Sequence, residues 1–170
     1  LRKLTNVKAV RLLVPDEITN ATSVPFLNVQ QLWDNSLGLK PDLTGRNIKI
    51  GIIDTGVDYI HANFGGTGAL SDYQANDRTT NADGYFPTAK VTGGFDFAGD
   101  KYNASAGTSA DPTDSDVPQP DPDPMDCNSH GSHVAGSAAG LGVNTDGSPF
   151  AGPFGVTTPF NALRIGPGTA

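Results

Sequence analysis

The sequence is poor in sulfur and in long apolar stretches. It holds one cysteine and one methionine among 170 residues, so no disulfide can form within it. Its longest apolar runs, such as residues 50–53, are far shorter than the roughly 20 residues that cross a bilayer. We therefore expect no membrane-spanning segment. Cys127 is a free thiol, an intermolecular link, or half of a pair whose partner lies outside these residues.

Basic side chains are also scarce, with 11 Lys and Arg against 18 Asp and Glu and a net charge of -7. The imbalance is uneven along the chain. Residues 1–49 carry seven basic and four acidic groups (+3), and residues 50–170 carry four basic and fourteen acidic groups (-10). No basic stripe exists that could follow a nucleic-acid backbone, so we exclude a nucleic-acid partner.

Glycine and proline are abundant, with 21 and 13 residues, which disfavours a helical bundle or a coiled coil. Residues 47–53 form a β-branched run that ends on Asp54, and this pattern predicts a buried strand with an acid at its carboxyl end. Residues 129–140 are rich in small side chains. They predict a helix from about residue 131 to 141 that packs closely against neighbouring backbone. The expected fold class is α/β, with a parallel sheet flanked by helices.

Two residues are candidates for catalysis, Asp54 after the predicted strand and His130 at the start of the predicted helix. A carboxylate can hold an imidazole in one tautomer, which lets the imidazole act as a general base toward a hydroxyl nucleophile. Taken singly, each residue has a structural explanation, as a turn or cap residue and as a packed histidine. A metal site on His130 and His133 is disfavoured because His61 is the only other histidine and no HExxH pattern occurs.

Together, the two segments resemble the subtilisin-like serine proteases. The segment IKIGIIDTGVDYIHAN (residues 48–63) is similar to the family's segment around its catalytic Asp, and HGSHVAG (residues 130–136) is similar to its HGTHVAG block. The resemblance implies a partial subtilisin-like fold, with Asp54 as the orienting acid and His130 as the general base. It also implies a secreted, extracellular endopeptidase that acts on polypeptide substrates.

Neither a metal nor an organic cofactor enters the chemistry that this resemblance implies. A structural calcium ion is possible in such a protein, but no site for it can be assigned. The sequence departs from the family pattern at Ser132, where the family usually has Thr, and at Ala62-Asn63, where it usually has Pro-Asp. The loss of that Asp puts in doubt any calcium site that would use it.

The resemblance also predicts how the chain is organised. Because LTNVKAVRLLV is similar to the last strand of a subtilase propeptide, we expect residues 1–14 to be the end of an inhibitory propeptide. Residues 15–27 are then a linker, and residues 28–170 are the N-terminal part of the catalytic domain. The segment RIGPGTA (residues 164–170) resembles the stretch that precedes a core strand. The propeptide is the expected intramolecular partner of the catalytic domain.

A nucleophilic serine is the missing member of the triad. The family places it after the His, in a GTSMA-like segment, with an oxyanion-hole Asn before it, and neither follows His130 here. The sequence Gly-Thr-Ser-Ala at residues 107–110 precedes the His and is interpreted as a coincidence. We therefore expect these residues to be inactive alone, and Cys127 to have its partner further along the polypeptide.

Other interpretations remain open. An aspartic protease could use Asp54-Thr55-Gly56, but it needs a second such motif or a homodimer and leaves HGSHVAG unexplained. The chain could also be an inactive subtilase homologue, or an acidic binding module based on the Asp-rich residues 100–126, which are interpreted as an exposed loop. Two sequons, at Asn20 and Asn103, would suit N-glycosylation of a secreted protein, or they occur by chance.

Overall fold

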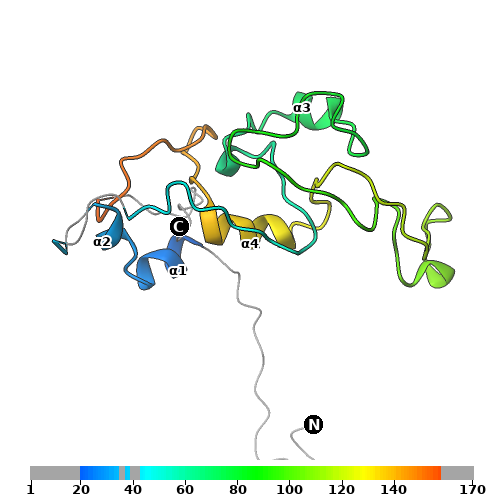
Figure 1. The fold of residues 1–170 in the computed structure, drawn as a ribbon, viewed down its shortest axis with the longest axis horizontal. Helices are drawn as coiled ribbons and strands as arrows, with labels where there is room; N and C mark the ends of the chain where they lie inside the picture. The colour runs from blue at the N-terminus through cyan, green and yellow to red at the C-terminus, as the bar shows by residue number, and fades with distance from the viewer. Residues whose placement is uncertain (1–19, 35–36, 39–42, 158–170) are drawn as a thin grey trace, which may run out of the picture.

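The computed structural model describes residues 20–34, 37–38 and 43–157. Their short helices are joined by long irregular segments (Figure 1): α1 Asn20–Phe26, α2 Gln30–Trp33, η1 Ala62–Phe64, α3 Leu70–Ala75, η2 Ala106–Thr108 and α4 His130–Ala139. The predicted propeptide end and the RIGPGTA segment lie outside the described residues. None of the described helices is long and apolar enough to cross a membrane.

Helix α4 confirms the helix predicted from the small-residue segment, within two residues at its C-terminal end. Gly131, Ala135 and Gly136 are its buried residues. A Cβ atom at Gly131 would overlap the carbonyl oxygen of Gly56, and one at Gly136 would lie 2.7 Å from the side-chain nitrogen of Asn63. The small side chains therefore let two other segments lie directly against the helix backbone.

The predicted buried strand is wrong for this structure. Residues 48–53 are irregular, and Ile50, Ile52 and Ile53 are 45%, 38% and 104% exposed. The described part of the chain holds only three isolated β-bridges and no named strand. A parallel strand is held by hydrogen bonds to its neighbours. None of the described segments pairs with residues 49–53, so the run has the composition of a strand without its partners.

The predicted linker, residues 15–27, contains helix α1 in its described part. Val24 anchors this helix, because it is 2% exposed. The short helix α2 begins at Gln30, and Asn28 before it adopts a left-handed φ of 57°. Trp33 in α2 is buried and packs edge-on against Phe154, with ring centroids 6.1 Å apart.

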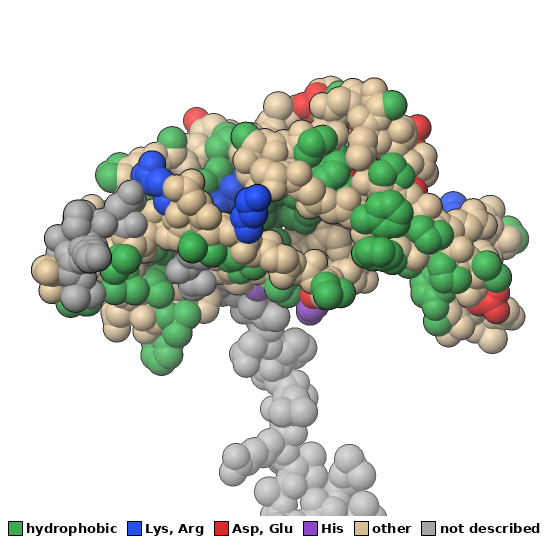
Figure 2. All heavy atoms as spheres, in the orientation of Figure 1, with side chains coloured by type: hydrophobic (Ala, Val, Ile, Leu, Met, Phe, Trp, Pro, Cys, Tyr) green, Lys and Arg blue, Asp and Glu red, His purple; other side chains and the backbone are tan. Residues whose placement is uncertain are grey.

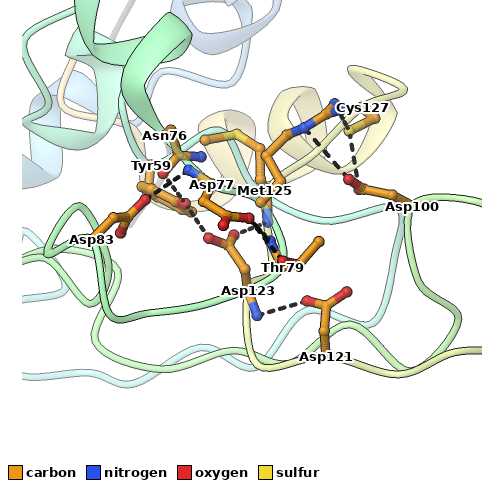
Figure 3. A network of polar contacts seen from close by, with 11 residues as sticks. Tyr59, Asn76, Asp77, Thr79, Asp83, Asp100, Asp121, Asp123, Met125 and Cys127 are labelled. Carbon is orange, nitrogen blue, oxygen red and sulfur yellow. Dashed lines mark hydrogen bonds and ion pairs between the residues drawn. The ribbon is translucent and has the colours of Figure 1, made fainter.

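A small core lies beside the acidic segment that leads into α4. It contains Tyr59, Ile60 and Phe86, and the rings of Tyr59 and Phe86 lie 5.1 Å apart. The hydroxyl of Tyr59 donates a 2.6 Å hydrogen bond to Asp123, which is 1% exposed (Figure 3). This contact joins the segment after residue 54 to the segment before residue 130, so it holds both halves of the candidate site in one unit.

Residues 96–121 form an arm that leaves this core, with η2 near its tip (Figure 1). Backbone hydrogen bonds between Asp96 and Asp121 close its base, and Ser115 bonds to Lys101 and Asn103 further out. The prediction of an exposed loop over residues 100–126 holds for most of the arm. It is wrong at Asp123 and Pro124, which are buried.

Candidate active site

Asp54 and His130 lie in contact although 76 positions separate them in the sequence. The Oδ1 atom of Asp54 is 2.7 Å from the Nδ1 atom of His130. This distance falls within the range of about 2.6 to 3.2 Å for a hydrogen bond between catalytic groups, as expected for an orienting acid and its histidine. The Asp54 side chain is 17% exposed and the His130 side chain is 67% exposed, so the imidazole reaches solvent beyond its contact with the acid.

The contact changes the proton affinity of both groups. The hydrogen bond from His130 lowers the pKa of Asp54, aided by the backbone N–H of Thr55, which donates to Oδ1 at 2.7 Å. The same hydrogen bond raises the pKa of His130 above its ordinary 6.5. Asp54 is therefore ionised at neutral pH and favours a proton on Nδ1. This leaves Nε2 as the ring atom that can accept a second proton.

Backbone contact between two segments sets the spacing of the pair. The Thr55 hydroxyl accepts a 2.8 Å hydrogen bond from the N–H of Gly131, the residue after His130. Gly56 has a φ of 121°, and a Cβ atom there would lie 2.7 Å from the carbonyl oxygen of Pro124. Because neither Gly56 nor Gly131 has room for a side chain, the turn after Asp54 lies directly against the start of α4.

The other two histidines lie apart from this pair, one in a contact with the backbone and the other partly buried in a helix. His61 accepts a 3.1 Å hydrogen bond from the backbone of Asn63 at the start of η1. His133 is half-buried within α4. Within the described residues, no group of three or more His, Cys, Asp and Glu side chains is arranged to hold a metal ion.

Asn63, at a position where the resemblance leads one to expect an Asp, has a structural role. It is 4% exposed, and its side-chain oxygen accepts a 2.7 Å hydrogen bond from the N–H of Gly142. Its carbonyl oxygen also accepts from the N–H of Leu141. Asn63 thus fixes the chain that leaves α4, and its amide oxygen is already occupied within the protein.

Cys127 lies three residues before His130 and has no disulfide partner among the described residues. Its sulfur accepts a 2.9 Å hydrogen bond from Arg78, and Arg78 also pairs with Asp100 at 3.5 Å. Figure 3 shows this group beside the buried Tyr59–Asp123 contact. Burial raises the pKa of the Cys127 thiol, although Arg78 opposes the shift.

The two predicted glycosylation residues lie far from one another in the sequence. Asn20 is the first residue of α1. Asn103 lies on the arm, where its side-chain nitrogen donates a 2.8 Å hydrogen bond to Asp114. The nitrogen that would carry a glycan at Asn103 is therefore already engaged within the protein.

The sequence analysis missed Asp126 and Thr55, which contact both halves of the site. The signal for Asp126 was its place four residues before His130, where an acid can accept hydrogen bonds from the first N–H groups of a helix. That signal was hidden because six Asp residues fall within residues 111–126. The signal for Thr55 was its position directly after Asp54.

Comparison with known families supports the class that this geometry suggests. The model of the subtilase family matches residues 45–163, a span that contains both Asp54 and His130. The match covers more than half of the chain, and the chain belongs to the subtilase family. It is thus a member of a serine peptidase family with an α/β fold, although the described residues show no parallel sheet. Neither the curated proteins nor the solved structures gave a match.

Proposed function

We propose that the chain carries the acid and the base of a serine endopeptidase that hydrolyses peptide bonds of extracellular proteins. Asp54 is the orienting acid and His130 is the general base. The observation that carries this proposal is the 2.7 Å contact between Asp54 Oδ1 and His130 Nδ1, made by two motifs that lie within the subtilase match.

The proposed mechanism follows from the orientation of the imidazole. Asp54 accepts the Nδ1 proton, so Nε2 carries the free electron pair that removes the proton from a serine hydroxyl. The serine oxygen attacks the peptide carbonyl carbon. His130 then returns the proton to the leaving amine, and Asp54 stabilises the imidazolium while it exists. No metal or organic cofactor takes part in the proposed reaction.

The nucleophile of this mechanism is not assigned among the 170 residues. We propose that a serine segment elsewhere in the polypeptide supplies it, together with the oxyanion-hole donor. The 170 residues alone are then without peptidase activity. One observation supports this part of the proposal: His130 contacts Asp54 while its side chain remains 67% exposed, so a further segment can reach the imidazole.

Secretion and a propeptide are the remaining parts of the proposal. They rest on the subtilase resemblance of residues 4–14 and on the two sequons. Residues 1–14 would be the end of an inhibitory propeptide, residues 15–27 the linker to the catalytic domain, and residues 28–170 the first part of that domain. The partners of the site would then be the protein's own propeptide and its polypeptide substrates.

The test uses a polypeptide that contains these 170 residues together with the proposed serine segment. We expect it to react with a fluorophosphonate probe and to cleave a peptide substrate. His130→Ala should abolish both, by roughly 10⁶-fold in turnover, a magnitude that belongs to the well-studied case of subtilisin. His133→Gln, in the same helix, is the matched control and should retain activity. Activity of the 170 residues alone, lost in His130→Ala, would show that the nucleophile has been misplaced.

A further inference from the structure

Asp126 accepts more hydrogen bonds than its place in an irregular segment would suggest. Its Oδ1 atom accepts from the Thr55 hydroxyl at 2.9 Å and from the N–H groups of Asn128 and Ser129 at 2.8 and 3.0 Å. Its Oδ2 atom accepts from the N–H and the hydroxyl of Ser132, at 2.8 and 2.7 Å. One carboxylate thus contacts the turn after Asp54 and both sides of His130.

These contacts supply a cap that helix α4 lacks. The first N–H groups of a helix have no partner inside it, and a side chain at the N-cap position usually accepts from one of them. Here the N-cap residue Ser129 has a φ of 75° and makes no side-chain cap. Asp126 takes the N–H of Ser132, and Thr55 takes the N–H of Gly131. The helix that carries His130 is therefore capped by groups that also contact the segment of Asp54.

Thr55 connects the two candidate catalytic residues through this cap. Its backbone N–H donates to Asp54, its hydroxyl donates to Asp126, and that hydroxyl accepts from Gly131. Ser132 continues the network, because its hydroxyl accepts a 2.8 Å hydrogen bond from the N–H of Asp58. A shift of α4 relative to the turn after Asp54 would break several of these bonds at once.

We propose that Asp126 is a positioning residue, which fixes the start of α4 to the Thr55 turn and so holds His130 at hydrogen-bonding distance from Asp54. It acts through Thr55 and Ser132 and does not touch the reacting atoms. The inference rests on the proposed function for its effect on turnover, but the geometric effect can be measured without any activity.

The ionised form of Asp126 suits this role. Burial opposes its charge, but hydrogen bonds from Ser132, Asn128 and Thr55 outweigh burial and lower its pKa. Both oxygens accept, so an amide in the same place could replace only one of them. Its nitrogen would face an N–H or hydroxyl donor with a donor of its own. Asp126→Asn should therefore weaken the link on one side of His130.

The first experiment measures the site in the 170-residue chain by NMR. In the unchanged chain we expect a low-field resonance from the Nδ1 proton and a raised pKa for His130. Thr55→Val is nearly isosteric and removes no charge, but it breaks the bonds to Asp126 and Gly131. We expect it to weaken the low-field resonance and to move the His130 pKa toward 6.5, and Thr55→Ser should restore both. Asp126→Asn should act in the same direction as Thr55→Val.

Charge alone must be separated from position, because the negative charge of Asp126 itself helps to raise the pKa of His130. Asp116→Asn removes one charge from the same acidic stretch, at an exposed residue of the arm, and should leave the low-field resonance unchanged. If Asp126→Asn does not fold, Thr55→Val and its Ser rescue decide the question. An unchanged resonance and pKa in Thr55→Val would overturn the proposal.

A second experiment uses the polypeptide that contains the serine segment. Misplacement of a catalytic group by about 1 Å can cost about 100-fold in rate, so Asp126→Asn should lower kcat by up to about that factor and change KM little. Full turnover in Asp126→Asn, with His130→Ala inactive, would reject the positioning role and leave the proposed function intact. Full turnover in His130→Ala would instead reject the proposed function, while the NMR result on Asp126 would still stand.

Discussion

The Nδ1 atom of His130 lies 2.7 Å from the Oδ1 atom of Asp54, and the imidazole remains 67% exposed. Solvent can therefore titrate the histidine without opening the structure. Because the hydrogen bond to Asp54 raises the pKa of His130, we expect an NMR titration midpoint above 6.5. In Asp54→Asn the midpoint should fall, since the charge and the strong acceptor are both lost. An unchanged midpoint in Asp54→Asn would argue against a specific contact.

The same contact predicts how stability and activity depend on pH. Because the pKa of His130 is raised in the folded protein, the pair's contribution to the free energy of unfolding is complete below pH 6.5, the ordinary pKa of histidine. It is lost as the pH rises through the pKa of the folded state. The lowered pKa of Asp54 means that its contribution is present above about 3.8 and is lost as the pH falls. Turnover needs the neutral imidazole, so the acidic limb of kcat/KM should have its midpoint above 6.5. A midpoint at or below 6.5 would contradict the contact.

Gly131→Ala should destabilise the protein because the new methyl group would overlap the backbone of Gly56. Overpacking of this kind costs about 1–3 kcal/mol, and here it would also displace α4 from the Thr55 turn. Urea unfolding measures the loss of stability, and the low-field proton of His130 reports the displacement. Gly107→Ala is the matched control, because a Cβ atom there meets nothing within 4 Å. Equal unfolding midpoints for the two variants would show that the contact between Gly131 and the backbone of Gly56 leaves room for a methyl group.

The exposed isoleucines of residues 48–53 should make the 170-residue chain prone to aggregation. Ile53 is 104% exposed and Ile52 is 38% exposed, and the backbone beside them has no ladder partner in the part of the chain described. Unpaired strand-like segments with apolar side chains promote association. Figure 2 shows further hydrophobic side chains on one face of the molecule. We expect the chain to bind hydrophobic dyes and to aggregate on heating.

A pair of substitutions tests whether residues 48–53 cause the aggregation. Ile53→Thr should reduce dye binding and delay aggregation at a cost within about 0.5 kcal/mol, as for other exposed residues. Ile60→Thr, at a residue that is 3% exposed, should instead lower stability by about 2 kcal/mol and increase aggregation. A monomeric chain with a sharp unfolding transition and no dye binding would show that the exposed run has no such effect.

Tyr59→Phe should remove a hydrogen bond that stabilises a buried carboxylate. Asp123 is 1% exposed and accepts from the Tyr59 hydroxyl at 2.6 Å, so its loss should cost about 1–3 kcal/mol. Tyr85→Phe, at a half-buried residue of the same core, is the control and should change stability little. Urea unfolding of the two variants gives the comparison.

The deficit of Tyr59→Phe should also depend on pH. Burial already raises the pKa of Asp123, and the hydrogen bond from Tyr59 opposes that rise. Without the hydroxyl the folded-state pKa rises further, so the folded protein holds the carboxyl proton more tightly than the unfolded chain. Stability then falls as the pH rises above about 3.8. The difference between Tyr59→Phe and the unchanged chain should be larger at pH 7 than at pH 4, and a constant difference would contradict this account.

The sequence was informative where a local pattern decides the structure. The small residues of 130–139 predicted α4 because only small side chains allow other backbone to lie against a helix. The motifs around Asp54 and His130 predicted their contact, which the structure confirms. Their catalytic role stays a prediction.

Other features depended on groups that are distant in the sequence. The run at 48–53 has the composition of a strand, but a strand exists only beside another strand. Helix α1 is anchored by the burial of Val24, which no periodic pattern announces. Asp126 could not be distinguished from the neighbouring Asp residues by composition. Its difference is that the turn after Asp54 folds back against it.

The close backbone contact between Gly56 and Gly131 has a consequence for how the sequence of such a site can change in evolution. Main-chain atoms of the two segments meet there, and the side chains of Thr55 and Asp126 hold the two segments together. Residues of the surrounding core can then change without altering the distance between acid and base, provided that Gly56 and Gly131 stay free of side chains and that Thr55 and Asp126 are kept. Another protein could therefore carry the Asp54–His130 pair if it reproduced the backbone contact between Gly56 and Gly131 and the cap made by Thr55 and Asp126. The rest of its sequence would stay free to vary.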